Sequence, residues 1–191
     1  MSLLPFCEWL AGTEWSIALH ESLHVYPMVQ TIHVLVLLPF IGMVIFVDLR
    51  LVGWAFRDVP IAEINARFLP WAIGAFCISV ITGALLFFAI PVRTYLSIFF
   101  RIKLLMLLIA GLNVIFLHRD THRNKAIWGA NGAAPFRVRV AGGLSLPSWG
   151  IVIIMGRMIA YNWFDCDKQP QPDWINSVAG CVIDLSQSGE F

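Results

Sequence analysis

Charged side chains are scarce in this chain of 191 residues: they make up 13% of it, against about 25% in soluble domains. Hydrophobic residues make up 59%, and the mean hydropathy is +0.77. A soluble domain of this length could not bury so much apolar surface, so we expect a single membrane domain over residues 1–191. Nothing in the sequence suggests nucleic-acid binding, because membrane topology explains where the basic residues lie.

The motifs of the common enzyme classes are also missing. The sequence has no Walker loop, no GxGxxG, no GxSxG and no HExxH. No nucleophile or general-base constellation is visible either, so a self-contained enzyme is the function we least expect.

The most prominent feature of the sequence is a set of long apolar runs. Four of them, at about 25–47, 69–91, 95–117 and 138–161, could cross a hydrocarbon core about 30 Å thick, which takes about 20 residues. Backbone polar groups in lipid must be satisfied within each segment, so these runs predict helices. The predicted fold is an all-α integral membrane bundle of four transmembrane helices, with the lipid bilayer as its first partner.

Lysine and arginine are unevenly distributed between the connecting segments. Residues 1–24 contain neither, and the tail 162–191 contains only Lys168, whereas the loops 48–68 and 118–137 are rich in arginine. Basic loops stay in the cytoplasm. We therefore expect a multi-pass protein with both termini on the outer side of the membrane.

The first segment, 1–24, is expected to lie at the outer membrane surface. Residues 3–19 read as one short amphipathic helix, with Trp9 and Trp15 as interfacial anchors.

The tail 162–191 is polar and turn-rich, and it holds two of the four cysteines. On the outer side these would meet an oxidising compartment, so a disulfide between Cys166 and Cys181 is expected, with two free thiols as the alternative.

Several unusual side chains fall at one depth. At about 1.5 Å per residue, His33 and Lys103 each lie about 12 Å below the outer edge, Met155 about 9 Å and Arg157 about 6 Å. No acidic residue of the predicted helices shares this level, so a haem propionate or a quinone carbonyl would complete the cluster. Two alternatives remain open: Arg157 could reach the interface, and Lys103 could pair with a helix carbonyl. Competing carboxylates lie in the outer segments, at Glu21, Asp165 and Asp167.

The other histidines are separated from this level. His24 is nine residues from His33 and points to the opposite side of a regular helix, and His20 belongs with His24 at the rim. His118 ends the third helix about 20 Å away, where a histidine suits the helix dipole. Asn113 is expected to donate to a neighbouring helix. Asn113 and His118 both remain candidates for contacting a cofactor.

Two further features concern packing between the helices. Asp48 and Arg50 are two residues apart and do not face each other, so each is expected to pair with the segment 118–123. Small residues should let the fourth helix approach its neighbours closely; they are Gly142, Gly143, Ser145, Gly150 and Gly156.

The sequence resembles a group of uncharacterised bacterial four-helix membrane proteins. The resemblance rests on P-x5-H-V-L, then DLRLVG, then K-x9-N-x4-H, then SL-x2-W-x6-GR-x2-AY. It is similar, more loosely, to the copper-resistance D type and to membrane b-type cytochromes. These resemblances imply a bacterial inner-membrane location and haem or copper at histidines within the membrane. Membrane b-type cytochromes usually pair histidines at matched depth on two helices, and this chain does not show that pairing. The matching residues are Pro27, His33, Asp48–Gly53, Lys103, Asn113, His118, Ser145, Trp149, Gly156, Arg157 and Tyr161.

The first functional hypothesis is a membrane electron-transfer subunit that binds haem b or interacts with a quinone. His33 would be the axial ligand, and Lys103 and Arg157 would meet the anionic groups of the cofactor. The second axial ligand would come from Met155, from His24 or His20, or from a partner subunit. With His33, His24 is thus a candidate metal ligand.

Two alternatives belong to other classes. One is transport of copper or a small solute, in which methionines and His33 would form soft copper sites; the methionines are Met28, Met43, Met155 and Met158. The other is a non-catalytic subunit that anchors a larger membrane complex. Partners would be other membrane or periplasmic redox subunits, or a second copy of the chain.

Overall fold

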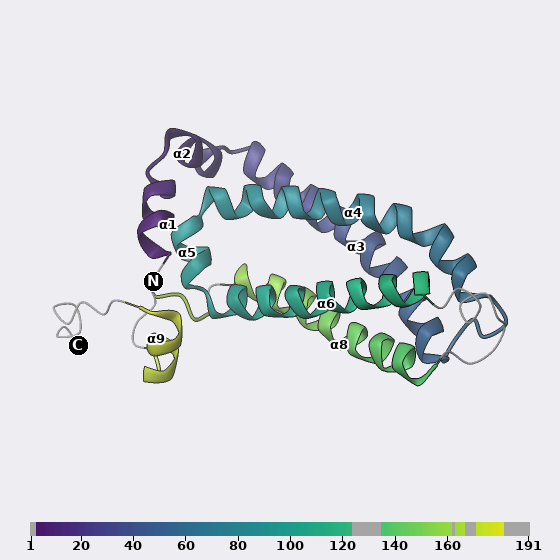
Figure 1. The fold of residues 1–191 in the computed structure, drawn as a ribbon. Coiled ribbons are helices and arrows are strands. Elements are labelled where there is room, and N and C mark those ends of the chain that lie inside the picture. Colours follow the sequence, from purple (N-terminus) through teal and green to yellow (C-terminus); the bar gives the residue numbers. More distant parts are fainter. Residues whose placement is uncertain (1–2, 124–134, 162, 167–170, 182–191) are drawn as a thin grey trace.

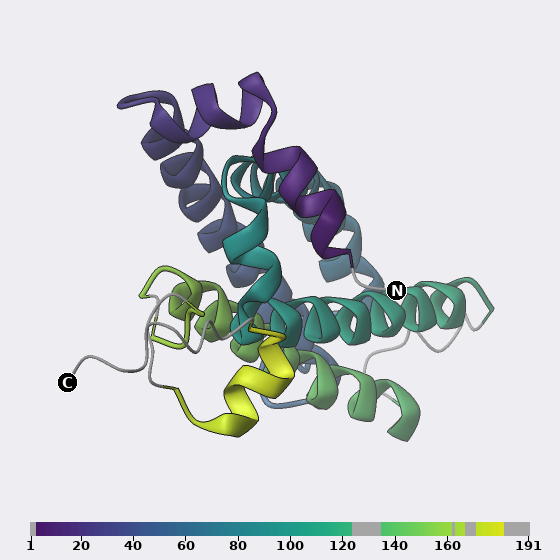
Figure 2. The same ribbon diagram turned by 90° about the vertical axis from the view of Figure 1, so that its left-hand side faces the viewer.

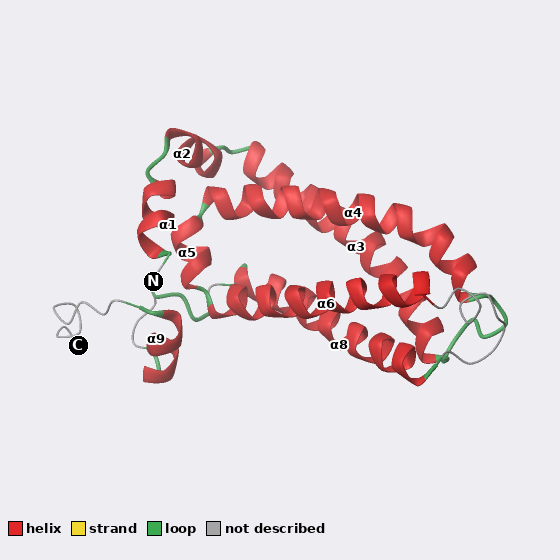
Figure 3. Ribbon diagram, viewed as in Figure 1, coloured by secondary structure: helices red, strands yellow, loops and turns green. Residues whose placement is uncertain are grey.

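The computed structural model describes residues 3–123, 135–161, 163–166 and 171–181, with side chains from 121 to 123 excepted. This part of the chain is all-helical, as predicted, and contains no strand (Figure 3). Residues Arg123 and Lys125 of the expected basic loop lie outside the described side chains, and so do His122, Asp167 and Lys168. The helices are α1 (Leu4–Ala11), α2 (Glu14–Glu21), α3 (Val25–Val52), α4 (Ile61–Ala89), α5 (Pro91–Leu96), α6 (Ile98–Arg123), α8 (Phe136–Ile159) and α9 (Asp173–Ala179).

Four of these helices, α3, α4, α6 and α8, are long and apolar enough to span a membrane. They run side by side, and α3 packs mainly on α4, α6 on α8, and α3 on α8 (Figure 1). The short helices α1, α2, α5 and α9 gather at one end, which we call the cap end (Figures 1 and 2). The opposite end, with the connection 53–60, is the loop end.

The first two long helices extend further toward the loop end than predicted. Helix α3 continues to Val52, where Gly53 ends it in a left-handed conformation (φ +84°) that suits glycine. Helix α4 begins at Ile61 rather than at 69. Its polar first turns are compatible with a helix because Glu63 and Arg67 form an exposed ion pair of 2.9 Å, one turn apart.

The third predicted helix is interrupted near its start. Ser97 has an extended conformation (ψ 123°) and separates α5 from α6. Helix α6 therefore begins at Ile98 instead of Tyr95. Lys103 is five residues, or about 7.5 Å, from the start of α6, and so lies closer to the cap end than predicted.

The N-terminal segment forms two short helices where one was predicted. Gly12 ends α1, and the Thr13 hydroxyl caps α2 by accepting from the backbone N–H of Ser16. The Ser16 hydroxyl donates to the carbonyl of Phe88 on α4 (2.8 Å), which ties α2 to the bundle. Trp9 and Trp15 are both exposed, as interfacial anchors would be.

The tail is fixed to the cap end. The predicted disulfide between Cys166 and Cys181 is present. The Arg101 guanidinium on α6 donates to the last two carbonyls of α9, those of Val178 and Ala179. Such an interaction compensates the negative C-terminal end of a helix.

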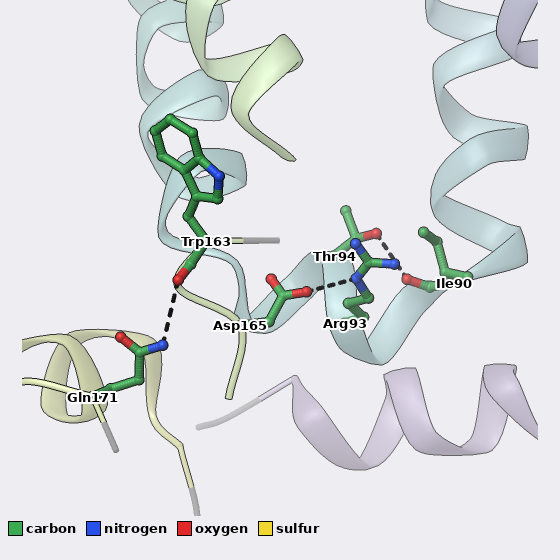
Figure 4. Close-up of polar contacts among 6 residues, drawn as sticks. All are labelled: Ile90, Arg93, Thr94, Trp163, Asp165 and Gln171. Carbon is green, nitrogen blue, oxygen red and sulfur yellow. Dashed lines mark hydrogen bonds and ion pairs between the residues drawn. The ribbon is translucent and has the colours of Figure 1, made fainter. Parts of the chain in front are cut away.

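An ion pair reinforces the same end. Arg93 on α5 pairs with Asp165 at 2.8 Å (Figure 4). One of the expected acidic partners of the intramembrane cations is therefore already engaged elsewhere.

Close packing of α8 depends on some of its small residues only. A Cβ at Gly142 would lie 2.8 Å from Leu51 Cβ and 3.2 Å from the Asp48 carbonyl oxygen, so α8 touches the backbone of α3 there. Gly156 contacts Lys103, but a Cβ at Gly143 or Gly150 would meet nothing within 4 Å. The prediction is thus wrong for these two.

Helices α6 and α8 are joined by a buried polar contact. The Asn113 side chain donates to the carbonyl of Ala141 at 2.9 Å, which confirms the predicted interhelical bond. Asn113 therefore has a structural role in this arrangement.

Candidate functional site

His33 is held on α3 by side chains and backbone of α4. Its Nδ1 lies 2.8 Å from the Thr82 hydroxyl oxygen. That hydroxyl donates to the carbonyl of Ile78 (2.8 Å), so it receives the proton of Nδ1–H. The ring fits because position 83 is glycine: a Cβ there would lie 3.3 Å from His33 Cε1. The carbonyl of Ser79 is a further hydrogen-bond partner.

Lys103 lies near His33, as predicted, since its charge acts on that ring. The end of its side chain rests on α8, where a Cβ at Gly156 would lie 3.4 Å from Nζ and 3.7 Å from Cε. His33 therefore faces α4 and Lys103 faces α8, and the two are near enough for their charges to interact.

The other predicted members of this cluster are not drawn into it. Arg157 is exposed, with its guanidinium 5.2 Å from the ring centre of Tyr161. Because Gly156 faces Lys103, the next residue points about 100° away around α8. Met155 is half-buried and forms no hydrogen bond with His33 in the described residues.

No second histidine of the described side chains reaches the level of His33. His24 precedes α3 and is exposed, about 13 Å from His33 along the helix axis. His20 is exposed beside Tyr26, with ring centres 6.2 Å apart. His118 is near the opposite end of the bundle. Within the described residues no three histidine, cysteine, aspartate or glutamate side chains gather as metal ligands.

A cavity of about 570 Å³ lies in the loop-end half of the bundle. Helices α4 and α6 make few direct contacts with each other, and the cavity lies between them, bordered by α3 and α8. Its wall is largely apolar. Lining residues include Phe40, Val44 and Asp48 of α3, Asn65, Phe68 and Ala72 of α4, Leu107, Gly111 and His118 of α6, and Ser145 and Trp149 of α8.

Two polar atoms of the residues that line this cavity lack partners in the described structure. Asp48 is 2% exposed, and although Ser145 donates to its carboxylate, Oδ2 has no hydrogen bond. Trp149 is 6% exposed, and its indole Nε1 also has none. The residues that line the cavity thus include one unpartnered acceptor and one unpartnered donor within a largely apolar wall.

Among the described side chains the partner of Asp48 is Ser145 on α8, whereas a partner in the segment 118–123, whose last three side chains lie outside the description, was expected. The reason is the close approach of α3 and α8 at Gly142, one turn from Ser145. Arg50, fully buried, donates from Nε to the carbonyl of Val59 at 2.7 Å. His118 and Arg119 are exposed and lie at the edge of the cavity.

The cavity is the feature that sequence reasoning missed. One signal was available: Ser145 and Trp149 are four residues apart and share a helical face. Another was Asp48, an acid near the end of an apolar run. Neither reveals that α4 and α6 stay apart.

Comparison with known proteins identifies a family and no further relative. No curated protein and no solved structure matches the chain. A likeness to the copper-resistance D type or to b-type cytochromes is therefore not shown. A family model does match, over residues 17–162, a range that includes α3 to α8 and both polar sites. The chain belongs to that family, DUF6644, a family of unknown function.

Proposed function

We propose that this protein is a multi-pass subunit of the bacterial inner membrane that binds a quinone in the cavity between α3, α4, α6 and α8. It would serve an electron-transfer complex. The observation that carries the proposal is a largely apolar cavity lined by Asp48 and Trp149, two residues whose buried atoms Oδ2 and Nε1 have no partner in the described structure.

The chemistry of a quinone complements this wall. A quinone ring is flat and apolar, and its carbonyl oxygens accept hydrogen bonds, so Trp149 Nε1–H can donate to one of them. In the reduced form the hydroxyl groups donate, and Asp48 Oδ2 can accept from one. A buried polar group without a partner costs about 1–3 kcal/mol, so a ligand that satisfies both groups recovers this cost.

The position of the cavity suits a ligand that arrives from lipid. Helices α4 and α6 make few contacts, so a long isoprenoid tail can extend between them into the bilayer. Ligand sites between helices of a bundle, with few polar groups on an apolar wall, follow the general pattern for cofactor sites. His118 and Arg119 at the edge would lie close to the cytoplasmic surface.

The redox step requires a partner. Oxidation of a quinol to a quinone releases two electrons and two protons. Asp48 can accept one proton, the second is released to water at the loop end, and both electrons must pass to a redox partner subunit that acts as the oxidant. This is why we propose a subunit of a membrane or periplasmic redox complex and not a self-contained enzyme.

Haem b is the weaker candidate for the cofactor. Thr82 orients His33 in the way that partners of metal-bound histidines do, and a neutral ring with Nδ1–H leaves Nε2 free to bind iron. However, the described residues bring no second histidine to that level, and Arg157 points away from Lys103. The quinone proposal requires neither a second histidine nor a contact from Arg157.

The orientation is part of the proposal. With the basic segments in the cytoplasm, the loop end lies inside and the cap end, with its disulfide, lies in the periplasm. A phosphatase reporter active only in the periplasm should give activity when fused at residue 181 and none when fused at 58.

The functional proposal is tested by titrating the purified protein with a short-chain ubiquinone and a short-chain menaquinone, each in its oxidised and its reduced form. Trp149→Phe should weaken binding of the quinone about tenfold and Asp48→Asn that of the quinol, because each loses one hydrogen bond of roughly 1–2 kcal/mol. Leu112→Ala, on an exposed part of α6, is the matched control and should bind normally. Equal affinity in all four proteins would exclude this site.

A further inference from the structure

A second polar cluster lies in the cap-end half of the bundle and shares no residue with the cavity wall. His33 is eight residues from the start of α3, about 12 Å along its axis, and Lys103 is about 7.5 Å from the start of α6. Helix α4 contributes Ser79 and Thr82, and α8 contributes the surface of Gly156. All four long helices therefore meet at this cluster.

Lys103 is the member without a counter-charge. It forms no hydrogen bond or ion pair with any described residue, although an ammonium carries three donors. Its Nζ ends beside Gly156, three residues before the end of α8. A cation held among helices without a partner loses its hydration and gains nothing in return.

Another donor faces the same region. Ser79, on the α4 face that receives His33, is 7% exposed, and its hydroxyl is buried without a partner. His33 has already given its Nδ1–H to Thr82, so it lies beside the cluster without a donor to spare. The cluster therefore offers an ammonium and a hydroxyl.

Acidic residues of the cap end do not balance these donors. Asp165 is already paired with Arg93, at 2.8 Å (Figure 4). The remaining described acids of this end are exposed to solvent; they are Glu8, Glu14, Glu21 and Asp173. The cation is thus available to a group from outside the described chain.

We propose that Lys103, with Ser79, binds one anionic oxygen group, a carboxylate or a phosphate, in the cap-end half of the bundle. The group belongs either to a soluble anion or to the headgroup of an anionic lipid. This site is independent of the quinone cavity, because the two share no residue. Its charged group is the Lys103 ammonium, whereas that of the cavity is the Asp48 carboxylate.

The soluble arm of the test measures the midpoint of thermal unfolding of the purified protein in rising acetate or phosphate. Binding to the folded state should raise the midpoint, by about 5 °C near saturation. Lys103→Met should abolish the rise. Arg157→Met removes an exposed cation next to Gly156 on α8 and should keep the rise, which controls for general salt effects.

The lipid arm compares the protein in phosphatidylcholine vesicles with and without phosphatidylglycerol. A rise in the midpoint only with phosphatidylglycerol, lost in Lys103→Met, assigns the site to a lipid headgroup, whereas a rise with acetate or phosphate assigns it to a soluble anion. If Lys103→Met does not fold, Ser79→Ala should weaken the response several-fold. No response in either arm, or an equal response in wild type and the variants, overturns the proposal.

Discussion

The indole ring of Trp149 on α8 stands edge-on against Phe40 on α3, with ring centres 4.9 Å apart and planes at 78°. Phe76 on α4 packs on the same indole at 6.5 Å. Aromatic neighbours on two helices thus fix the ring, while its N–H has no partner in the described structure. A fixed donor is what a pre-organised binding site requires.

Replacing Asp48 by asparagine should separate binding from folding. The amide oxygen of the introduced side chain can still accept from Ser145, and the buried charge is removed, so the free energy of unfolding should fall by less than about 1 kcal/mol or rise. Chemical denaturation in detergent measures it. Ser145→Ala is the companion variant, because it leaves the carboxylate without its donor and should cost about 1–3 kcal/mol. A larger loss in Asp48→Asn than in Ser145→Ala would contradict this account of the pair.

The contact between α8 and α3 gives a matched pair of glycine variants. Gly142→Ala should destabilise by about 1–3 kcal/mol, because the new Cβ would lie 2.8 Å from Leu51 Cβ. Gly143→Ala adds the same atom where nothing lies within 4 Å, so the helix should become more stable by up to about 1 kcal/mol. Thermal unfolding of both variants measures the difference, and similar midpoints would show that α8 does not approach α3 as described.

Removal of the disulfide should release the tail from the bundle. Cys166→Ser should lower the free energy of unfolding of the attached tail by about 3 kcal/mol, since the bond joins residues 15 apart. Buried contacts of α9 with Ile98, through Ile175 and Ala179, hold it less firmly alone. Limited proteolysis should cleave the variant near α9 while α3 to α8 stay intact. Unchanged cleavage would mean that these contacts suffice without the bond.

The thiol of Cys7 should react slowly with alkylating reagents. Its pKa is raised, first by burial and then by the negative charge of Glu8, so at a given pH less thiolate is present. Because the folded pKa is above the unfolded one, this thiol favours folding at neutral pH, and that contribution declines as pH rises through the usual thiol range. Glu8→Gln should speed alkylation of Cys7, as followed by mass spectrometry from about pH 7 to 10, on either side of the usual thiol pKa. An unchanged rate profile would show that Glu8 has no such influence.

The sequence predicted elements where physical chemistry leaves few alternatives. Four apolar runs had to be helices, and the bond from Asn113 followed from the cost of leaving an amide unsatisfied. Helix ends were less predictable: α4 continues through Glu63 and Arg67 because an exposed ion pair makes these turns compatible with a helix. The break at Ser97 has no such signal in the apolar run around it.

The candidate site was predicted only in part. The prediction used the depth of each residue along its helix but not the side of the helix on which the residue lies. His33 and Lys103 share a level and also a side, whereas Arg157 shares the level and points away. The cavity depends on the distance between α4 and α6, which make few contacts with each other. That distance belongs to the assembled bundle and cannot be derived from either helix alone.

Photolabelling with a photoreactive quinone analogue tests the central claim most directly. After irradiation and digestion, mass spectrometry should find the label on the cavity segments of α4 and α6, residues 65–76 and 107–119, and excess unlabelled quinone should suppress it. Trp149→Phe should reduce the labelling at these segments. Labelling confined to the His33 region, or labelling that excess quinone does not suppress, would contradict quinone binding in this cavity.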